Sequence, residues 1–133
     1  MTADPARAAS SWTKAKAHRA EALAQDPESS PMSVIHASYY AMFHAARAVL
    51  FQQTGSAPKT HDRTIQQFGL LVRDFDDALR VSAKAFNAIK DQRTAADYNE
   101  AVSPGPEEAR EALQAAVTFL AVCGSRYGFP DLP

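Results

Sequence analysis

The apolar residues of this chain are most concentrated between Ile35 and Phe51, a stretch that contains neither Gly nor Pro. Placed on a helix of about 3.6 residues per turn, they cover almost the whole circumference. A helix that is apolar nearly all round lies buried at the centre of a fold. We therefore predict that this helix is central. Its large apolar face consists of Ile35, Met42, Ala46, Val49 and Leu50. Its alanine face, which lets another helix approach closely, consists of Ala37, Ala41 and Ala48.

A third stripe of the same helix mixes aromatic and polar residues. Burying polar groups without partners is costly, so these side chains need partners inside the fold or from a ligand. The stripe is either a satisfied internal network, which is the more common case, or the floor of a site. Its members are His36, Tyr40, Phe43, Arg47 and Phe51, with His44 at the edge.

The remaining sequence predicts further helices separated by Pro and Gly. We expect a first helix over about 6–25 and a second from Pro31 to about Gln53. A third helix should begin after Thr60, which is its N-cap. A fourth should cover about 79–99, and a fifth should run from Glu107 to Gly124. In the fourth helix, the helical spacing of Val81, Ala85, Ile89 and Ala96 indicates the buried side, flanked by Phe86.

No segment shows the alternation that is typical of a β-strand. The sequence therefore predicts an all-α fold, an up-and-down bundle of four or five helices. The length of 133 residues fits a single domain. We expect its core to span about 7–127.

Composition excludes several classes of protein. The 14 basic and 15 acidic residues give a net charge of −1, so no basic field indicates a protein that coats duplex nucleic acid. The single Cys123 excludes an internal disulfide and a Cys-based zinc site. No apolar run is long enough to cross a membrane, and no signal peptide is recognisable. We expect a cytoplasmic protein.

Candidate chemistry lies first at the end of the fourth helix. Arg93 and Asp97 are four residues apart, so their side chains can meet, and Tyr98 follows directly. On spacing alone, the simplest interpretation is an ion pair on the helix surface. The alternative is a site that combines cationic, anionic and phenolic groups.

A second cluster, Lys59, Thr60 and His61, stands at the start of the third helix. The free N–H groups of a helix start favour a phosphate or another anion. No Gly-rich phosphate loop is present. His36 and His44 are eight residues apart, too far to share a metal ion, so we expect neither a metal nor another cofactor.

Three segments together resemble a known family. The run Ser38–Ala48 is similar to the "YYAMFHAARALL" helix of small stand-alone HEPN-domain proteins, and Lys59–His61 resembles the "KTH" segment of that branch. Arg93–Tyr98 resembles its "R..ADY" segment. The resemblance spans roughly residues 7–127, almost the whole chain.

The resemblance implies a helical bundle that forms a homodimer through its central helices. Many members are metal-independent ribonucleases, others bind nucleotides or RNA, and many stand beside a nucleotidyltransferase in a toxin–antitoxin or defence module. In some of these pairs, a Tyr near the Arg motif is modified with AMP. Cutting members carry an Arg and a His with four to six residues between them. Here Tyr98 stands where that His would first be allowed after Arg93.

The hypothesis from sequence is the HEPN half of a two-component module with a nucleotidyltransferase, acting on RNA through a dimeric cleft. The alternatives are a non-catalytic HEPN protein that binds nucleotide, RNA or a protein partner, and a plain helical interaction module. The candidate catalytic residues are Arg93, Asp97, Tyr98, His61 and His44, and the candidate ligand-binding residues are Lys59 and Thr60.

Overall fold

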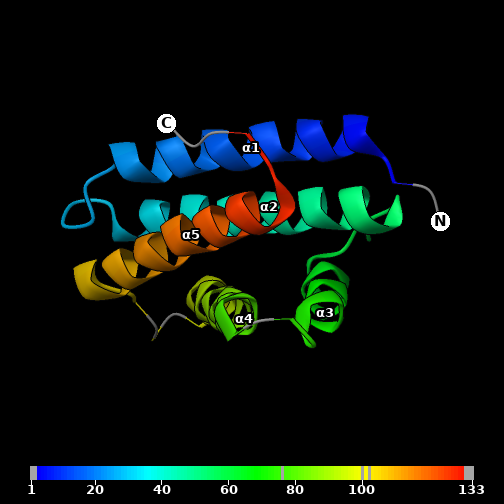
Figure 1. Cartoon of the computed structure of the whole chain (residues 1–133). Helices are drawn as coiled ribbons and strands as arrows, with labels where there is room; N and C mark the ends of the chain where they lie inside the picture. The colour runs from blue at the N-terminus through cyan, green and yellow to red at the C-terminus, as the bar shows by residue number, and fades with distance from the viewer. Residues whose placement is uncertain (1–2, 76, 100, 102, 131–133) are drawn as a thin grey trace.

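The computed structural model describes residues 3–75, 77–99, 101 and 103–130, and these form five helices with no strand (Figure 1). The all-α prediction is therefore confirmed. The helices are α1 (Pro5–Ala24), α2 (Pro31–Thr54), α3 (His61–Val72), α4 (Asp77–Tyr98) and α5 (Pro106–Tyr127).

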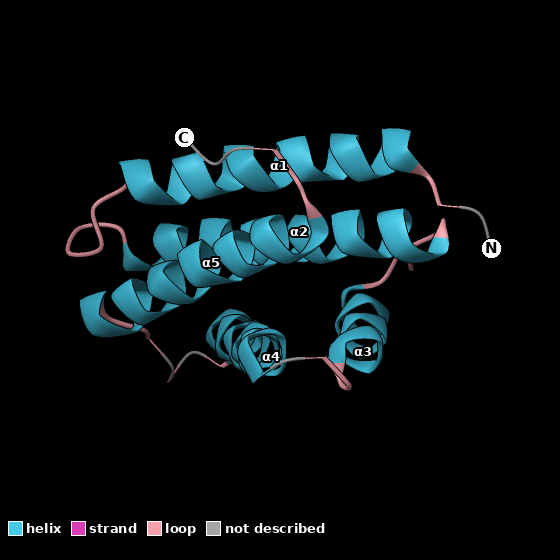
Figure 2. Ribbon diagram, in the orientation of Figure 1, coloured by secondary structure: helices cyan, strands magenta, loops and turns pink. Residues whose placement is uncertain are grey.

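Helix α2 is the centre of the fold, because each of the other four helices packs against it. Figure 2 shows α1 and α5 running alongside α2, while α3 and α4 are seen end-on on the side away from α1. The residues of the large apolar face and the alanine face of α2 are at most 4% exposed. The alanine face is thus already covered within one chain, so it is not free to pair with a second copy.

The ends of α2 and α3 follow from local residue chemistry. Pro31 occupies the first turn of α2, where its missing N–H costs nothing. Gly55 ends α2 with φ of 83°, a left-handed conformation that Gly adopts without a steric penalty. The Thr60 side chain accepts a hydrogen bond from the Arg63 N–H and so caps α3. These boundaries agree with the sequence prediction.

The last helix continues past Gly124, which was expected to end it. Helix α5 runs to Tyr127, and Gly128 ends it with φ of 72°. Gly124 instead makes room for Trp12, since a Cβ at this position would lie 3.3 Å from the indole ring. The chain then turns back, so that Phe129 stacks on Trp12 with ring centroids 4.7 Å apart.

The buried side of α4 agrees with the prediction at Ile89 and Phe86 but not at Val81. Val81 is 64% exposed, whereas the residues that face the core are Leu79, Ser82, Phe86 and Ile89. Phe86 directs this choice, because its ring packs against Phe119 with centroids 5.3 Å apart. Arg93 lies seven residues after Phe86, about two helical turns further along the same side. The α4 packing therefore turns Arg93 toward α2.

Candidate functional site

The Arg93 guanidinium lies over the aromatic stripe of α2. Its central carbon is 4.7 Å from the centroid of the Tyr39 ring and 5.6 Å from that of Tyr40. The side chain is only 20% exposed. A cation held on two aromatic rings is stabilised by about 1–2 kcal/mol when it is partly desolvated. Arg93 is therefore not the simple surface ion-pair partner that its spacing from Asp97 suggested.

Asp97 links Arg93 to a second group on α2. Its carboxylate is 3.7 Å from Arg93 Nε and 3.4 Å from His36 Nε2. The first distance is longer than a hydrogen bond, so this contact is electrostatic. Asp97 thus lies between a guanidinium and an imidazole from two helices, an arrangement that helical spacing on α4 alone does not reveal.

His61, the first residue of α3, joins the same cluster through Tyr39. The Tyr39 hydroxyl and His61 Nδ1 are 2.6 Å apart. The imidazole also stacks on Phe43, with centroids 4.3 Å apart and an interplanar angle of 11°. Burial, and after it the positive charge of Arg93, lowers the pKa of His61 below its ordinary value. The imidazole is consequently neutral at pH 7.

His44 lies at the other end of this cluster. Its ring packs edge-on against Phe43 at 5.2 Å and stacks on His18 of α1 at 5.3 Å. Burial, reinforced by the neighbouring His18, lowers the pKa of His44 to about 4. Phe43 therefore contacts both imidazoles, His44 edge-on and His61 face to face.

Lys59 and Thr60 stand apart from the Arg93 cluster. The Thr60 hydroxyl is the helix cap described above, so its acceptor is already used by the Arg63 N–H. Lys59 is exposed and, with Arg63, lines an open pocket of about 360 Å³ beside the loop that precedes α3. Lys59 thus borders a different pocket from the one beside Asp97.

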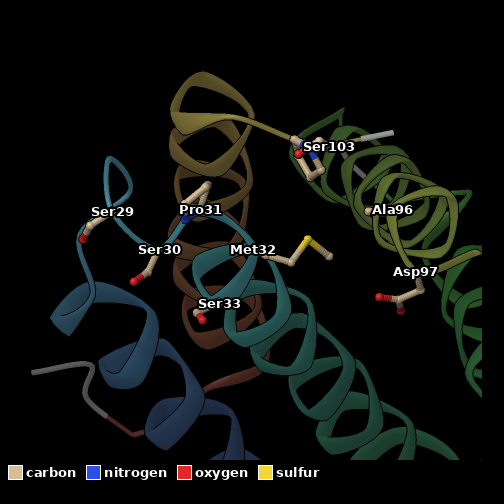
Figure 3. A pocket seen from close by; sticks show the side chains of 9 residues that line it. Ser29, Ser30, Pro31, Met32, Ser33, Ala96, Asp97 and Ser103 are labelled. Carbon is tan, nitrogen blue, oxygen red and sulfur yellow. The ribbon is translucent and has the colours of Figure 1, made fainter. Parts of the chain in front are cut away.

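Tyr98 points away from the aromatic stripe. It is 85% exposed, at the last position of α4. Asp97, directly before it, instead borders an open pocket of about 460 Å³. Figure 3 shows this pocket between the start of α2 and the end of α4, with several Ser side chains around it. The labelled hydroxyl residues are Ser29, Ser30, Ser33 and Ser103.

Sequence reasoning missed three participants in this cluster. Tyr39 and His18 were given no role, and His36 was not expected to contact Asp97. Only His36 could have been found from the sequence, because it belongs to the polar stripe of α2.

In the part of the chain that the structure describes, no three His, Cys, Asp or Glu side chains are grouped to hold a metal ion. None of the helices described is long and apolar enough to span a membrane.

Comparison with known families gives a decisive match. The profile of the HEPN domain matches residues 9–126, nearly the whole chain. This chain belongs to the HEPN family. Searches against curated proteins and against solved structures gave no match. The HEPN family includes ribonucleases and nucleotide-binding proteins.

The low pKa of His44 in this HEPN protein predicts how its stability depends on pH. The unfolded chain takes up a proton near pH 6.5, but the folded chain does so only near pH 4. The unfolded state therefore binds more protons between these values, and the free energy of unfolding should fall as the pH is lowered from about 6.5 to about 4. Urea unfolding at a series of pH values should show this fall in the wild type and a flatter dependence in His44→Gln.

An NMR titration of the His44 ring protons provides the direct check. Their resonances should begin to move only as the pH approaches 4. A midpoint near the ordinary histidine pKa would contradict the enclosed position of this ring.

Proposed function

We propose that this HEPN protein binds RNA at the face formed by Arg93, Asp97, His61, Tyr40 and His36, and that it is the HEPN half of a two-component module with a nucleotidyltransferase. The observation that carries the proposal is the position of Arg93. Its guanidinium is held on Tyr39 and Tyr40 beside a neutral imidazole. A guanidinium fixed in this way suits a phosphate, which accepts hydrogen bonds from its planar array of donors.

The aromatic surroundings favour RNA over a simple anion. Unpaired bases stack on exposed aromatic and imidazole rings, and single-stranded RNA is bound by such stacking together with cations that contact phosphates. Tyr40 and His36 are both partly exposed beside Arg93. The Ser-lined pocket next to Asp97 offers space and hydroxyl groups for a neighbouring nucleotide. The absence of a general basic field fits a small contact with few phosphates.

Two copies of the face would make a cleft. The dimer expected for the family cannot use the alanine face of α2, because that face is buried within one chain. The partly exposed stripe residues remain, among them His36, Tyr40 and His44. Pairing through this stripe would bring two Arg93 side chains toward one bound RNA.

Binding is better supported than cleavage. A general base for the ribose 2′-hydroxyl must accept a proton near neutral pH. Tyr98 stands where cutting relatives carry His, and it projects into solvent. His44 has a pKa of about 4, which is low for such a base. A metal-independent ribonuclease is the second candidate, favoured by the closeness of His61 to the Arg93 cluster.

Replacement of Arg93 tests the binding site. In Arg93→Gln, loss of the charge-assisted hydrogen bonds should weaken the binding of a fluorescent, single-stranded RNA of mixed sequence by about tenfold or more. The measurement is fluorescence anisotropy, repeated with a chelator present while the RNA is examined for cleavage. Intact RNA that remains bound supports the binding function, and cleavage would favour the ribonuclease.

The control is Arg80→Gln on the same helix. Arg80 forms an ion pair with Asp77 at the other end of α4, and its side chain is exposed. This variant removes the same charge but should bind RNA within about twofold of the wild type. If both variants lose affinity equally, the cause is net charge and the Arg93 site is refuted.

Arg93→Gln should also lower the free energy of unfolding, measured with urea, by about 1–2 kcal/mol, because the contacts of the guanidinium with the rings are lost.

The composite cleft requires a dimer. Sedimentation equilibrium at micromolar concentration should give twice the chain mass of 14.4 kDa. Tyr40→Glu should shift the protein toward monomer, because it places two like charges near one another in the proposed interface. A monomer in the wild type would remove the composite cleft.

Tyr98 is the expected target of the nucleotidyltransferase partner. Its exposed phenol can attack the α-phosphorus of ATP: the phenolic oxygen gains AMP, its proton is released and pyrophosphate leaves. The added negative charge, one residue from Asp97, would compete with RNA for Arg93. Co-expression with a nucleotidyltransferase encoded beside this protein, followed by intact-mass measurement, should show an AMP adduct that is absent from Tyr98→Phe. An adduct that persists in Tyr98→Phe would show that another residue is the target.

A further inference from the structure

The hydrogen bond between Tyr39 and His61 has a defined direction. Tyr39 is fully buried, and burial raises the pKa of its phenol further above neutrality, with the charge of Arg93 opposing the rise. The phenol therefore keeps its proton. His61 is neutral at pH 7, so one of its ring nitrogens carries no proton and can accept. At 2.6 Å, the Tyr39 O–H donates and His61 Nδ1 accepts.

This direction determines which His61 nitrogen carries hydrogen. In a neutral imidazole, one nitrogen is a donor and the other an acceptor. With Nδ1 accepting from Tyr39, the hydrogen of His61 must be on Nε2. Among the residues described, none accepts a hydrogen bond from Nε2, and the imidazole is partly exposed.

We propose that Tyr39 is a positioning residue: its hydroxyl holds His61 in the Nε2–H form, so that His61 donates a hydrogen bond to the phosphate bound by Arg93 and does not act as a base. The inference rests on the function proposed above and specifies the chemistry of that site. The same ring of Tyr39 supports the Arg93 guanidinium. One buried side chain thus orients both donors, and the ligand they match is an acceptor with several oxygens, a phosphodiester or a terminal phosphate.

The charged neighbours of His61 act in the same direction. The nearby cations Arg93, Arg47 and Lys90 disfavour the imidazolium, and only Asp62 favours it. Asp62 is itself paired with Lys90, whose Nζ lies 2.8 Å from a carboxylate oxygen. Tyr40 approaches His61 edge-on and adds no charge. The charged neighbours of His61 therefore stabilise its neutral form, and the bond from Tyr39 selects the Nε2–H tautomer of that form.

The test is the protonation state of His61 in Tyr39→Phe. This variant keeps the ring under Arg93 and removes only the hydroxyl, so the Nδ1 acceptor is freed. Long-range proton–nitrogen NMR of histidine-labelled protein should find the Nε2–H form in the wild type. In Tyr39→Phe the nitrogen shifts should move toward a mixture of the two neutral forms, and the His61 pKa should rise, because a bond that favoured the neutral ring is lost.

RNA binding provides the second measurement. Affinity for the mixed-sequence RNA should become stronger in Tyr39→Phe as the pH is lowered from about 8 to about 6, because the freed imidazole gains a proton and a charge. Over the same range the affinity of the wild type should change less than twofold. Tyr40→Phe is the matched control for the NMR measurement alone: it also removes a phenol beside Arg93, but one that does not bond His61, so its His61 resonances should match the wild type.

The outcomes separate this inference from the proposed function. An Nδ1–H form in the wild type, or unchanged His61 shifts in Tyr39→Phe, would overturn the role of Tyr39 whether or not RNA binds. If the NMR result is as expected but Arg93→Gln binds RNA as well as Arg80→Gln, the tautomer assignment stands and the RNA function fails. Should Tyr39→Phe not fold, the wild-type spectrum alone decides the assignment.

Discussion

The structure depends on the burial of α2 on almost all sides. Its apolar and alanine faces are covered by neighbouring helices, and only the stripe of aromatic and polar side chains still needs partners. Those partners come from the start of α3 and the end of α4. Because an unpaired polar group is costly inside a protein, the same requirement that completes the core brings His61 and Arg93 onto one surface of α2.

Tyr39 is the side chain at which packing and site chemistry meet. Its ring packs against Phe86 of α4 and supports the Arg93 guanidinium, while its hydroxyl bonds His61. The packing of Phe86 therefore sets the rotation of α4, and that rotation sets the position of Arg93. A change in the core would be felt at the site, because Phe86 and Arg93 lie on the same side of one helix.

The sequence was sufficient for the fold class, a bundle of four or five helices and most helix ends, since these depend on local signals such as Pro31, Gly55 and Thr60. It failed where two local patterns compete. On α4, Val81 begins one plausible apolar stripe and Leu79 another, and only contact with Phe119 decides between them. The four-residue spacing of Arg93 and Asp97 by itself indicated an ion pair on the helix surface, so the contact of Arg93 with Tyr39 was not predicted. The same limit applies to the His36–Asp97 contact, which joins residues far apart in the chain.

The way Arg93 is held suggests why a dimer would matter for this site. Ring contacts restrict the guanidinium before any ligand arrives, so less conformational entropy is lost on binding. Asp97 works in the opposite sense, because its carboxylate at 3.7 Å competes with a phosphate for the same cation. One face alone would therefore bind a phosphate group specifically but weakly. If the proposed dimer forms, two linked faces would raise the effective concentration of the second contact, and a protein of net charge −1 would then hold an RNA strand through a few ordered cations.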